Sequence, residues 1–127
     1  MRCGIAHRVA GSLRWEGAPG PVAYVDCDPG QSEVGPPATL GMRLHEPEGG
    51  RQELLRFVGS NTPVRHLLQT ATGAQALVSE AHRREVKPVI VDSSGFVTGR
   101  VAEEFQINLV DLLRPDVIVL VEKDTPL

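Results

Sequence analysis

Residues 21–33 read PVAYVDCDPGQSE, an apolar run that ends in two aspartates and a proline-glycine turn. The run Pro21–Asp26 is apolar on both faces of an extended chain, which is typical of a strand buried in a parallel sheet. Asp26 and Asp28 stand at its end. Such a carboxylate loses hydration unless it accepts hydrogen bonds or binds a cation. The two acids therefore predict a polar site at the end of a buried strand.

Two further apolar runs predict buried strands, Pro88–Asp92 (PVIVD) and Val117–Glu122 (VIVLVE). Segments with apolar residues at helical spacing alternate with the strands. These helical segments are residues 1–15, 62–85 and 103–113. The alternation predicts an α/β fold with three layers, in which helices cover both faces of a parallel sheet. Residues 35–44 and 53–59 add a hairpin or an edge pair.

The whole chain, residues 1–127, is predicted to form a single domain. Its composition, 41% hydrophobic and 23% charged, is ordinary for a globular protein. No apolar run is long enough to span a membrane, and residues 1–14 do not resemble a secretory signal. Cys3 and Cys27 lie far apart and are expected to be reduced thiols of a cytoplasmic protein. The histidines share no metal-ligand spacing, so no structural metal is expected.

The ends of the predicted strands are where such sheets bind ligands. The second strand ends in Asp92, and Ser93, Ser94 and Gly95 follow. Carboxylates at neighbouring strand ends suit magnesium beside phosphate groups. The alternative is turn chemistry, because Asp-Pro-Gly also forms plain turns. Phe96 is either an aromatic at the rim of the site or a core residue.

Four blocks of sequence, taken in order, resemble the P-loop polynucleotide 5′-hydroxyl kinase family. That family includes the RNA kinases of pre-mRNA cleavage and ribosomal RNA processing. The blocks are YVDCDPGQSEVGPPATLG (24–41), FVGSNTP (57–63), VIVDSSGFVTG (89–99) and LLRPDVIVLVE (112–122). The prokaryotic members are the more similar, because of GQSEVGPPATLG and because DSSGF resembles their aspartate-threonine-x-glycine block.

The resemblance implies transfer of the γ-phosphate of ATP to the 5′-hydroxyl of RNA or DNA, with Mg²⁺ as cofactor. Asp28 and Gln31 match the family's Asp-x-x-Gln motif, in which the aspartate is the base and a magnesium contact. Asp26, Asp92 and Ser93 fall on nucleotide and metal positions. Which of the acids takes the ordinary Walker B part is left open, since both strand ends fit.

The resemblance also implies a substrate-binding block. Gly95 and Phe96 fall where a tryptophan of the eukaryotic members stacks on the terminal base, and a phenylalanine also offers a π-face. Residues 60–63 are expected to cap the following helix, whereas the resemblance places them near the substrate. Arg100 follows the second strand end and is a candidate contact for a nucleic-acid backbone. Its alternative is an arginine solvated on a helix.

Three parts of a kinase are absent from the 127 residues. These residues contain no GxxxxGK[ST], the loop that cradles nucleotide phosphates, and no arginine-bearing lid of the family's kind. The central strand that precedes this loop in the family is also absent. We therefore expect an incomplete P-loop domain that is inactive alone. It is either a piece of a longer kinase or a remnant that binds nucleotide or RNA, and a P-loop GTPase or ATPase is a third interpretation. Self-association through open strand edges is expected.

Overall fold

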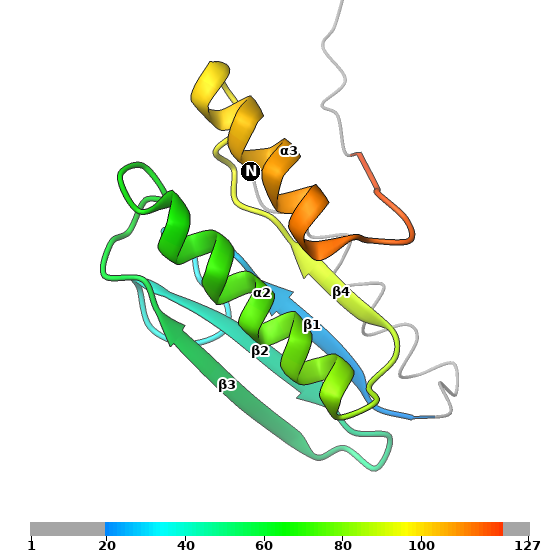
Figure 1. The fold of residues 1–127 in the computed structure, drawn as a ribbon. Helices are drawn as coiled ribbons and strands as arrows, with labels where there is room; N and C mark the ends of the chain where they lie inside the picture. Colours follow the sequence, from blue (N-terminus) through cyan, green and yellow to red (C-terminus); the bar gives the residue numbers. More distant parts are fainter. Residues whose placement is uncertain (1–19, 121–127) are drawn as a thin grey trace, which may run out of the picture.

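A computed structural model describes residues 20–120 of the chain as a small α/β domain (Figure 1). It contains a four-stranded mixed sheet and two helices. The elements are β1 (Val22–Asp26), β2 (Thr39–His45), β3 (Arg51–Phe57), α2 (Leu67–Arg83), β4 (Val89–Asp92) and α3 (Arg100–Leu113). The helix predicted for residues 1–15 lies outside the described residues. Neither α2 nor α3, the helices of the described part, is long and apolar enough to cross a membrane.

The strands have the order β3-β2-β1-β4. β1 is parallel to β4, whereas β1–β2 and β2–β3 are antiparallel pairs. The predicted hairpin, the first two predicted buried strands and the parallel pairing of these two strands are confirmed, but the sheet as a whole is mixed rather than parallel. The reason is the tight turn after β2, where the Glu46 N–H donates to the Gly50 carbonyl at 2.9 Å and reverses the chain. Only the crossover through α2 is long enough to restore a parallel pair.

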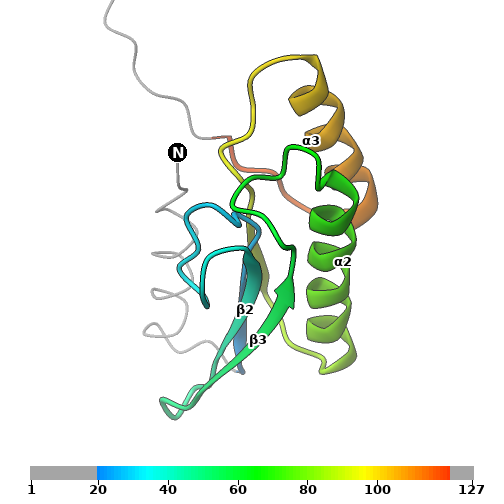
Figure 2. The ribbon, with the colours of Figure 1, turned by 90° about the vertical axis from the view of Figure 1, so that its left-hand side faces the viewer.

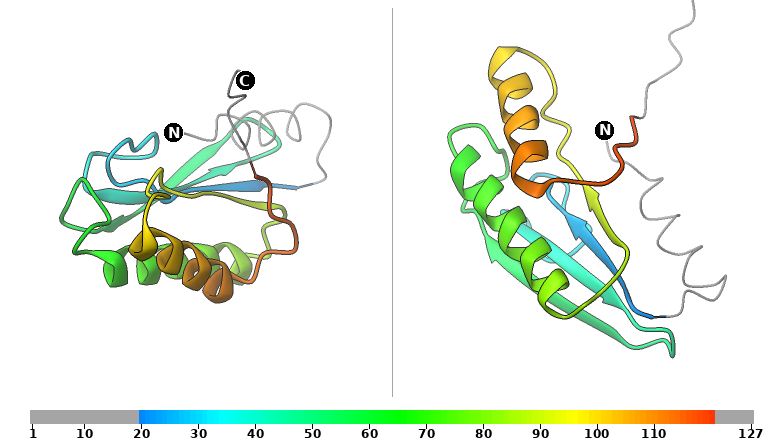
Figure 3. Two further views of the ribbon diagram at one scale, coloured as in Figure 1. Left: turned by 90° about the horizontal axis from the view of Figure 1, so that it is seen from above. Right: turned by 45° about the vertical axis from the view of Figure 1, so that its right-hand side comes forward.

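Both described helices lie side by side on one face of the sheet (Figures 2 and 3). The core fills the space between them and the sheet. It includes Val25 of β1, Met42 of β2, Leu77 of α2 and Phe105 of α3. The described residues thus form two layers. The helix predicted at residues 1–15, which the three-layer arrangement requires, falls outside them.

The beginning of α2 differs from the sequence prediction. The helix starts at Leu67, and no side chain caps it. Ser60 and Thr62 instead accept hydrogen bonds from the N–H groups two residues ahead, in the turns that precede the helix. Leu68 falls by its spacing on the apolar stripe of the segment 62–85, yet it is 73% exposed. Gly73 does not break the helix, and its missing side chain leaves room for Leu40, whose Cδ1 would lie 3.1 Å from an added Cβ.

The third predicted strand is not formed in its described residues. Val117–Leu120 has no regular secondary structure, and its four apolar side chains are 65–79% exposed. A strand forms only when its backbone groups find a partner. Within residues 20–120 the sheet ends at β4, and no strand lies beside the outer edge of β4. The prediction of a buried strand is therefore wrong for this segment.

Alternate residues of β4 direct their backbone N–H and C=O groups toward β1 and toward the open side of the sheet. The Ala23 N–H donates to the Pro88 carbonyl and the Cys27 N–H to the Asp92 carbonyl, so even-numbered positions of β4 face β1. The backbone groups of Val89 and Val91 consequently face the open side. An apolar strand with an open edge is a template for pairing with another chain.

We expect the 127-residue chain to self-associate through β4, as shown by sedimentation coefficients that rise with concentration. Val91→Pro should reduce the association, because it removes an N–H that faces outward. Ile90→Pro is the matched control. Its N–H faces β1, so this variant should lose thermal stability instead. A wild-type chain that sediments as a monomer at every concentration would contradict the expectation.

Candidate nucleotide and substrate site

Three loops meet at the edge of the sheet where β1, β3 and β4 end (Figure 1). Together they line an open hollow of about 440 Å³. The lining residues are Asp28, Gly30, Gln31, Asn61, Thr62, Pro63, Ser94, Gly95 and Phe96. The structure therefore brings together four residues that the sequence singled out, Asp28, Gln31, Gly95 and Phe96.

Asp26 holds the loop that follows β1 in its conformation. The residue is buried at the end of β1, and its two carboxylate oxygens accept different backbone N–H groups. Oδ1 accepts from Asp28 at 3.0 Å and Oδ2 from Glu33 at 2.6 Å. Backbone donors of this kind stabilise a buried carboxylate. Asp26 thus holds both ends of the segment 28–33 through these two hydrogen bonds and organises the loop.

Asp28 closes the turn and also faces the hollow. Its Oδ1 accepts the N–H groups of Gly30 at 2.9 Å and Gln31 at 3.2 Å. The turn chemistry weighed as an alternative is therefore present, on one oxygen. Among residues 20–120, no donor contacts Oδ2. One carboxylate can therefore shape the loop with one atom and offer the other to a ligand.

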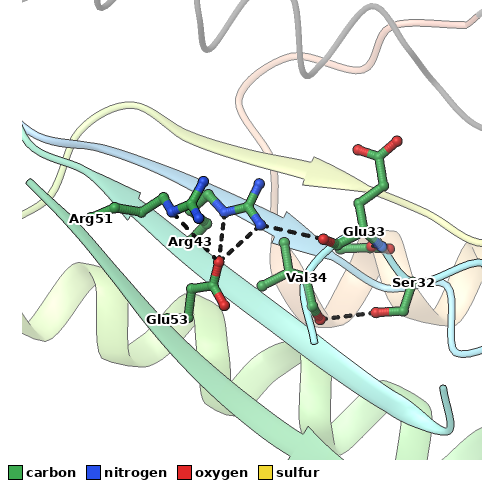
Figure 4. Close-up of polar contacts among 7 residues, drawn as sticks. Ser32, Glu33, Val34, Arg43, Arg51 and Glu53 are labelled. Atoms are coloured by element: carbon green, nitrogen blue, oxygen red, sulfur yellow. Dashed lines mark hydrogen bonds and ion pairs between the residues drawn. The ribbon is translucent and has the colours of Figure 1, made fainter. Parts of the chain in front are cut away.

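The rest of this loop lies over β2 on the face away from the helices (Figures 2 and 4). Arg43 donates from Nη2 to the Glu33 carbonyl at 3.3 Å and from Nε to Glu53 Oε1 at 2.9 Å. Ser32 Oγ donates to the Val34 carbonyl at 2.8 Å. Val34 is buried directly over Gly41, where an added Cβ would fall 2.5 Å from Val34 Cγ1. The loop is thus fixed to the sheet by a side-chain bond and by close packing.

Gly30 joins two of the three loops. A Cβ on this residue would lie 2.5 Å from the carbonyl oxygen of Asn61. The nearest neighbour of Gly30 on this side is thus the Asn61 backbone. The absence of a side chain therefore lets the β3–α2 loop approach Asp28.

Asp92 lies beneath the hollow, in register with Asp26 across the parallel pair. Tyr24 donates its hydroxyl to Asp92 Oδ2 at 2.9 Å. Burial, together with the Asp92 carboxylate, raises the pKa of Tyr24 well above its ordinary value, so the hydroxyl stays a donor. Burial likewise raises the pKa of the Cys27 thiol, which is therefore neutral.

The loop after β4 supplies the third wall of the hollow. Ser94 is buried and lines it, whereas Ser93, the residue chosen from the sequence, is exposed and does not. Phe96 lines the hollow and is half-buried, with its ring 6.3 Å from the ring of Phe105. Gln106 of α3 donates to the Phe96 carbonyl at 3.0 Å. Both interpretations of Phe96, rim and core, therefore apply.

Arg100 does not join the residues that line the hollow. It begins α3, its side chain is 91% exposed, and its Nε pairs with Glu104 at 3.1 Å. An exposed pair of this type is worth little and is easily exchanged. The structure therefore places Arg100 on the surface of α3.

The oxygen donors of the hollow suit a hard cation. Within residues 20–120, no three His, Cys, Asp or Glu side chains are grouped closely enough to hold a metal by themselves. Mg²⁺ does not require such a group, because it is usually held by one or two carboxylates with phosphates and water. Asp28 and the hydroxyl of Ser94 provide donors of this kind.

Asn61 was placed near the substrate only by the resemblance, as one of residues 60–63, and Ser94 was named only as a neighbour of Asp92; both line the hollow. Asn61 belongs to the FVGSNTP block, so the resemblance held a signal for its loop. Its contact with Gly30 spans 31 positions of the sequence, which local patterns do not report.

The chain is similar in sequence to known proteins over most of its length. The family described as mRNA cleavage and polyadenylation factor CLP1 P-loop matches residues 16–127. The polyribonucleotide 5′-hydroxyl-kinase of Thermococcus kodakarensis is 34% identical over 107 residues, which are 79% of this chain and 29% of that protein. The kinases of the same name from Methanocaldococcus jannaschii and Pyrococcus furiosus are 30% and 31% identical over 107 residues. These cover 80% of this chain and 29% and 30% of the relatives.

The chain thus spans less than a third of the length of the curated relatives that it matches. The family match covers most of the chain, including every loop that lines the hollow. This chain is a member of the CLP1 P-loop family.

Proposed function

We propose that the chain carries the part of an ATP-dependent polynucleotide 5′-hydroxyl kinase site that contains the catalytic base. The observation that carries the proposal is the shared hollow of Asp28 and Phe96. They come from loops after two different strands, yet a carboxylate oxygen and an aromatic ring face the same space. The 5′ end of a nucleic acid has a hydroxyl, whose proton a carboxylate can accept, and a nucleobase, on which an aromatic ring can stack.

The proposed reaction transfers the γ-phosphoryl group of ATP to the 5′-hydroxyl of RNA or DNA. The Oδ2 of Asp28 accepts the hydroxyl proton as the hydroxyl oxygen forms its bond to the γ-phosphorus. The bond between that phosphorus and the β,γ-bridging oxygen breaks, and ADP leaves with the electron pair. Asp26 holds the loop of Asp28 in place, Gln31 orients the reacting groups, and Phe96 stacks on the terminal base.

Asp28 and Ser94 are the residues proposed to hold Mg²⁺ at the hollow, with Asp92 behind them. The ion, when bound, neutralises the negative charge that develops on the phosphate oxygens. Asp92 acts through its position beneath the loop, where the Tyr24 hydroxyl fixes it.

A second candidate is a binding role without catalysis, in which the hollow holds a nucleotide end and no phosphoryl group is transferred. Phosphoryl transfer relies on the cradle GxxxxGK[ST], which is not among the 127 residues. An ATPase or GTPase role is the third. Both proposed enzymatic roles require the cradle to come from residues other than these.

A chimeric kinase separates the candidates. The 107 matched residues of the Thermococcus kodakarensis kinase would be replaced by those of this chain, and ATP and a 5′-hydroxyl oligonucleotide would be supplied. We expect labelled phosphate on the 5′ end, with the parent kinase as positive control. Release of free phosphate alone would favour an NTPase. A folded chimera that binds the oligonucleotide but transfers and releases nothing would favour the non-catalytic role.

A further inference from the structure

Phe96 lies beyond the end of β4, in a segment without regular secondary structure. β4 ends at Asp92, and residues 93–99 form no strand or helix before α3 begins at Arg100. The pairing of β4 with β1 therefore does not fix the conformation of Phe96. A ring that stacks on a base binds better when it is already held in one orientation, because ordering it upon binding costs free energy.

The segment between β4 and α3 runs back alongside the helix that it precedes. Figure 1 shows the chain leaving β4, reaching the beginning of α3 and reversing there. Gly99 stands at the reversal with a φ of +94°, which a residue with a side chain rarely adopts. Phe96 consequently lies beside the second turn of α3, where its ring centroid is 6.3 Å from that of Phe105.

Two residues of α3 hold Phe96, one through its ring and one through its backbone. Phe105 is buried, and the interplanar angle between its ring and that of Phe96 is 47°. Gln106 donates from Nε2 to the Phe96 carbonyl at 3.0 Å, across ten positions of the sequence. Side chains of a helix lean toward its N-terminus, so Gln106 can reach back to the segment that runs beside the first turns.

The Gln106 bond is directional, whereas the other contacts are not. Packing of Phe96 on Phe105 and the core is apolar, and apolar burial sets no direction. The Phe96 N–H donates to Ser94 Oγ at 3.4 Å, which is long for a hydrogen bond, and Ser94 belongs to the same loop. The bond from Gln106 therefore ties the backbone of Phe96 to the helix and fixes its orientation there.

We propose that Gln106 is a positioning residue of the site, which holds the ring of Phe96 in the orientation that stacks on the 5′-terminal base. The inference rests on the proposed function, in which Phe96 contacts that base. Gln106 is not among the described residues that line the hollow, and it acts through the Phe96 carbonyl. Its effect on binding should therefore depend both on Phe96 and on the presence of the first base.

The test measures how much the first base contributes to binding. The full 127-residue chain is titrated by fluorescence anisotropy with a 5′-hydroxyl RNA decamer and with the same decamer lacking its first base. The ratio of the two dissociation constants should be about 10 for the wild type, the effect of one stacked base. A variant that only weakens the fold changes both constants alike, so the ratio reports stacking.

Gln106→Met should lower this ratio by about 5-fold, the effect of one neutral hydrogen bond, because methionine has a similar length but no N–H donor. Gln106→Ala, which removes the packing as well, should give the same ratio. Asn108→Ala is the matched control. Asn108 is an exposed amide on the same helix, and its replacement should leave the ratio unchanged.

A double variant tests whether Gln106 acts through Phe96. Phe96→Ala should bring the ratio to about 1, since no ring is left to stack on the base. Adding Gln106→Met to Phe96→Ala should then change neither dissociation constant further. Two substitutions that act on the same contact are not additive, whereas independent ones are.

Two results would overturn this inference while leaving the proposed function standing. One is a wild-type ratio in Gln106→Met when Phe96→Ala has lost it. The other is an additive loss of affinity in the double variant, which would mean that Gln106 acts elsewhere. A wild-type chain that binds no RNA, or that binds both decamers equally, would overturn the inference together with the stacking role of Phe96. Phosphate transfer by the chimeric kinase would still be judged by its own experiment.

Discussion

Replacing Asp28 by asparagine in the chimeric kinase should lower kcat for 5′ phosphorylation by about 10²–10⁴-fold, the usual contribution of a general base. The asparagine oxygen can still accept the N–H groups of Gly30 and Gln31, so the turn is kept. What is lost is the second carboxylate oxygen, which has no protein donor in the described residues. KM for the oligonucleotide should change little, because the effect falls on the proton transfer.

Asp111→Asn is the matched control for this substitution. Asp111 is an exposed acid on α3, outside the hollow, and its replacement should leave kcat unchanged. The unfolding temperatures of both variants should agree with that of the unsubstituted chimera. If the Asp28 variant keeps full activity with an unchanged fold, then the carboxylate only closes the turn, and the base has to be sought elsewhere.

Gly41→Ala should destabilise the domain by about 3 kcal/mol, at the upper end of the effect of overpacking. The new Cβ would overlap Val34, whose Cγ1 and Cβ lie 2.5 and 2.6 Å from it and whose carbonyl oxygen lies closer still. β2 cannot retreat, because Gly41 is paired with Asp26 on one side and with Leu55 on the other. The loop over the sheet must move instead, which would strain the bond from the Glu33 N–H to Asp26.

The control for Gly41 is Gly20→Ala, since a Cβ at Gly20 meets nothing within 4 Å. Urea unfolding of the 127-residue chain compares the two variants in one experiment, provided that each is measured at the same protein concentration. Equal midpoints for both would show that the loop of Val34 gives way at little cost. A lower midpoint for Gly41→Ala alone confirms that the loop and the sheet are packed as one unit.

The parts of the fold that the sequence predicted are those with a strong local signal. β1 and β4 are continuous apolar runs that end in aspartate, and the helical segments show a regular period. Val117–Leu120 has an equally apolar pattern but is exposed, because a strand also depends on a neighbour that the pattern does not reveal. Leu68 has the spacing of the apolar residues of α2, yet it lies on the first turn of the helix and is exposed.

The residues of the hollow likewise divide into those with a local sequence signal and those without one. Asp26, Asp28 and Asp92 could be placed from the strand ends, since register alone brings Asp26 opposite Asp92. The choice between Ser93 and Ser94 could not be made, because the alternation of a strand no longer fixes side-chain direction once β4 has ended. The contact of Gly30 with Asn61 is a tertiary one and has no local signal.

The two backbone amides received by Asp26 have a consequence for how such a kinase can be assembled. The carboxylate and the amides lie within eight consecutive residues. The shape of the Asp28 loop therefore depends on hydrogen bonds within the loop itself, and it does not require a bound phosphate or an adjoining segment. An acidic half-site built in this way is ready for complementation. A separate polypeptide that brings only the phosphate cradle would find its counterpart already formed.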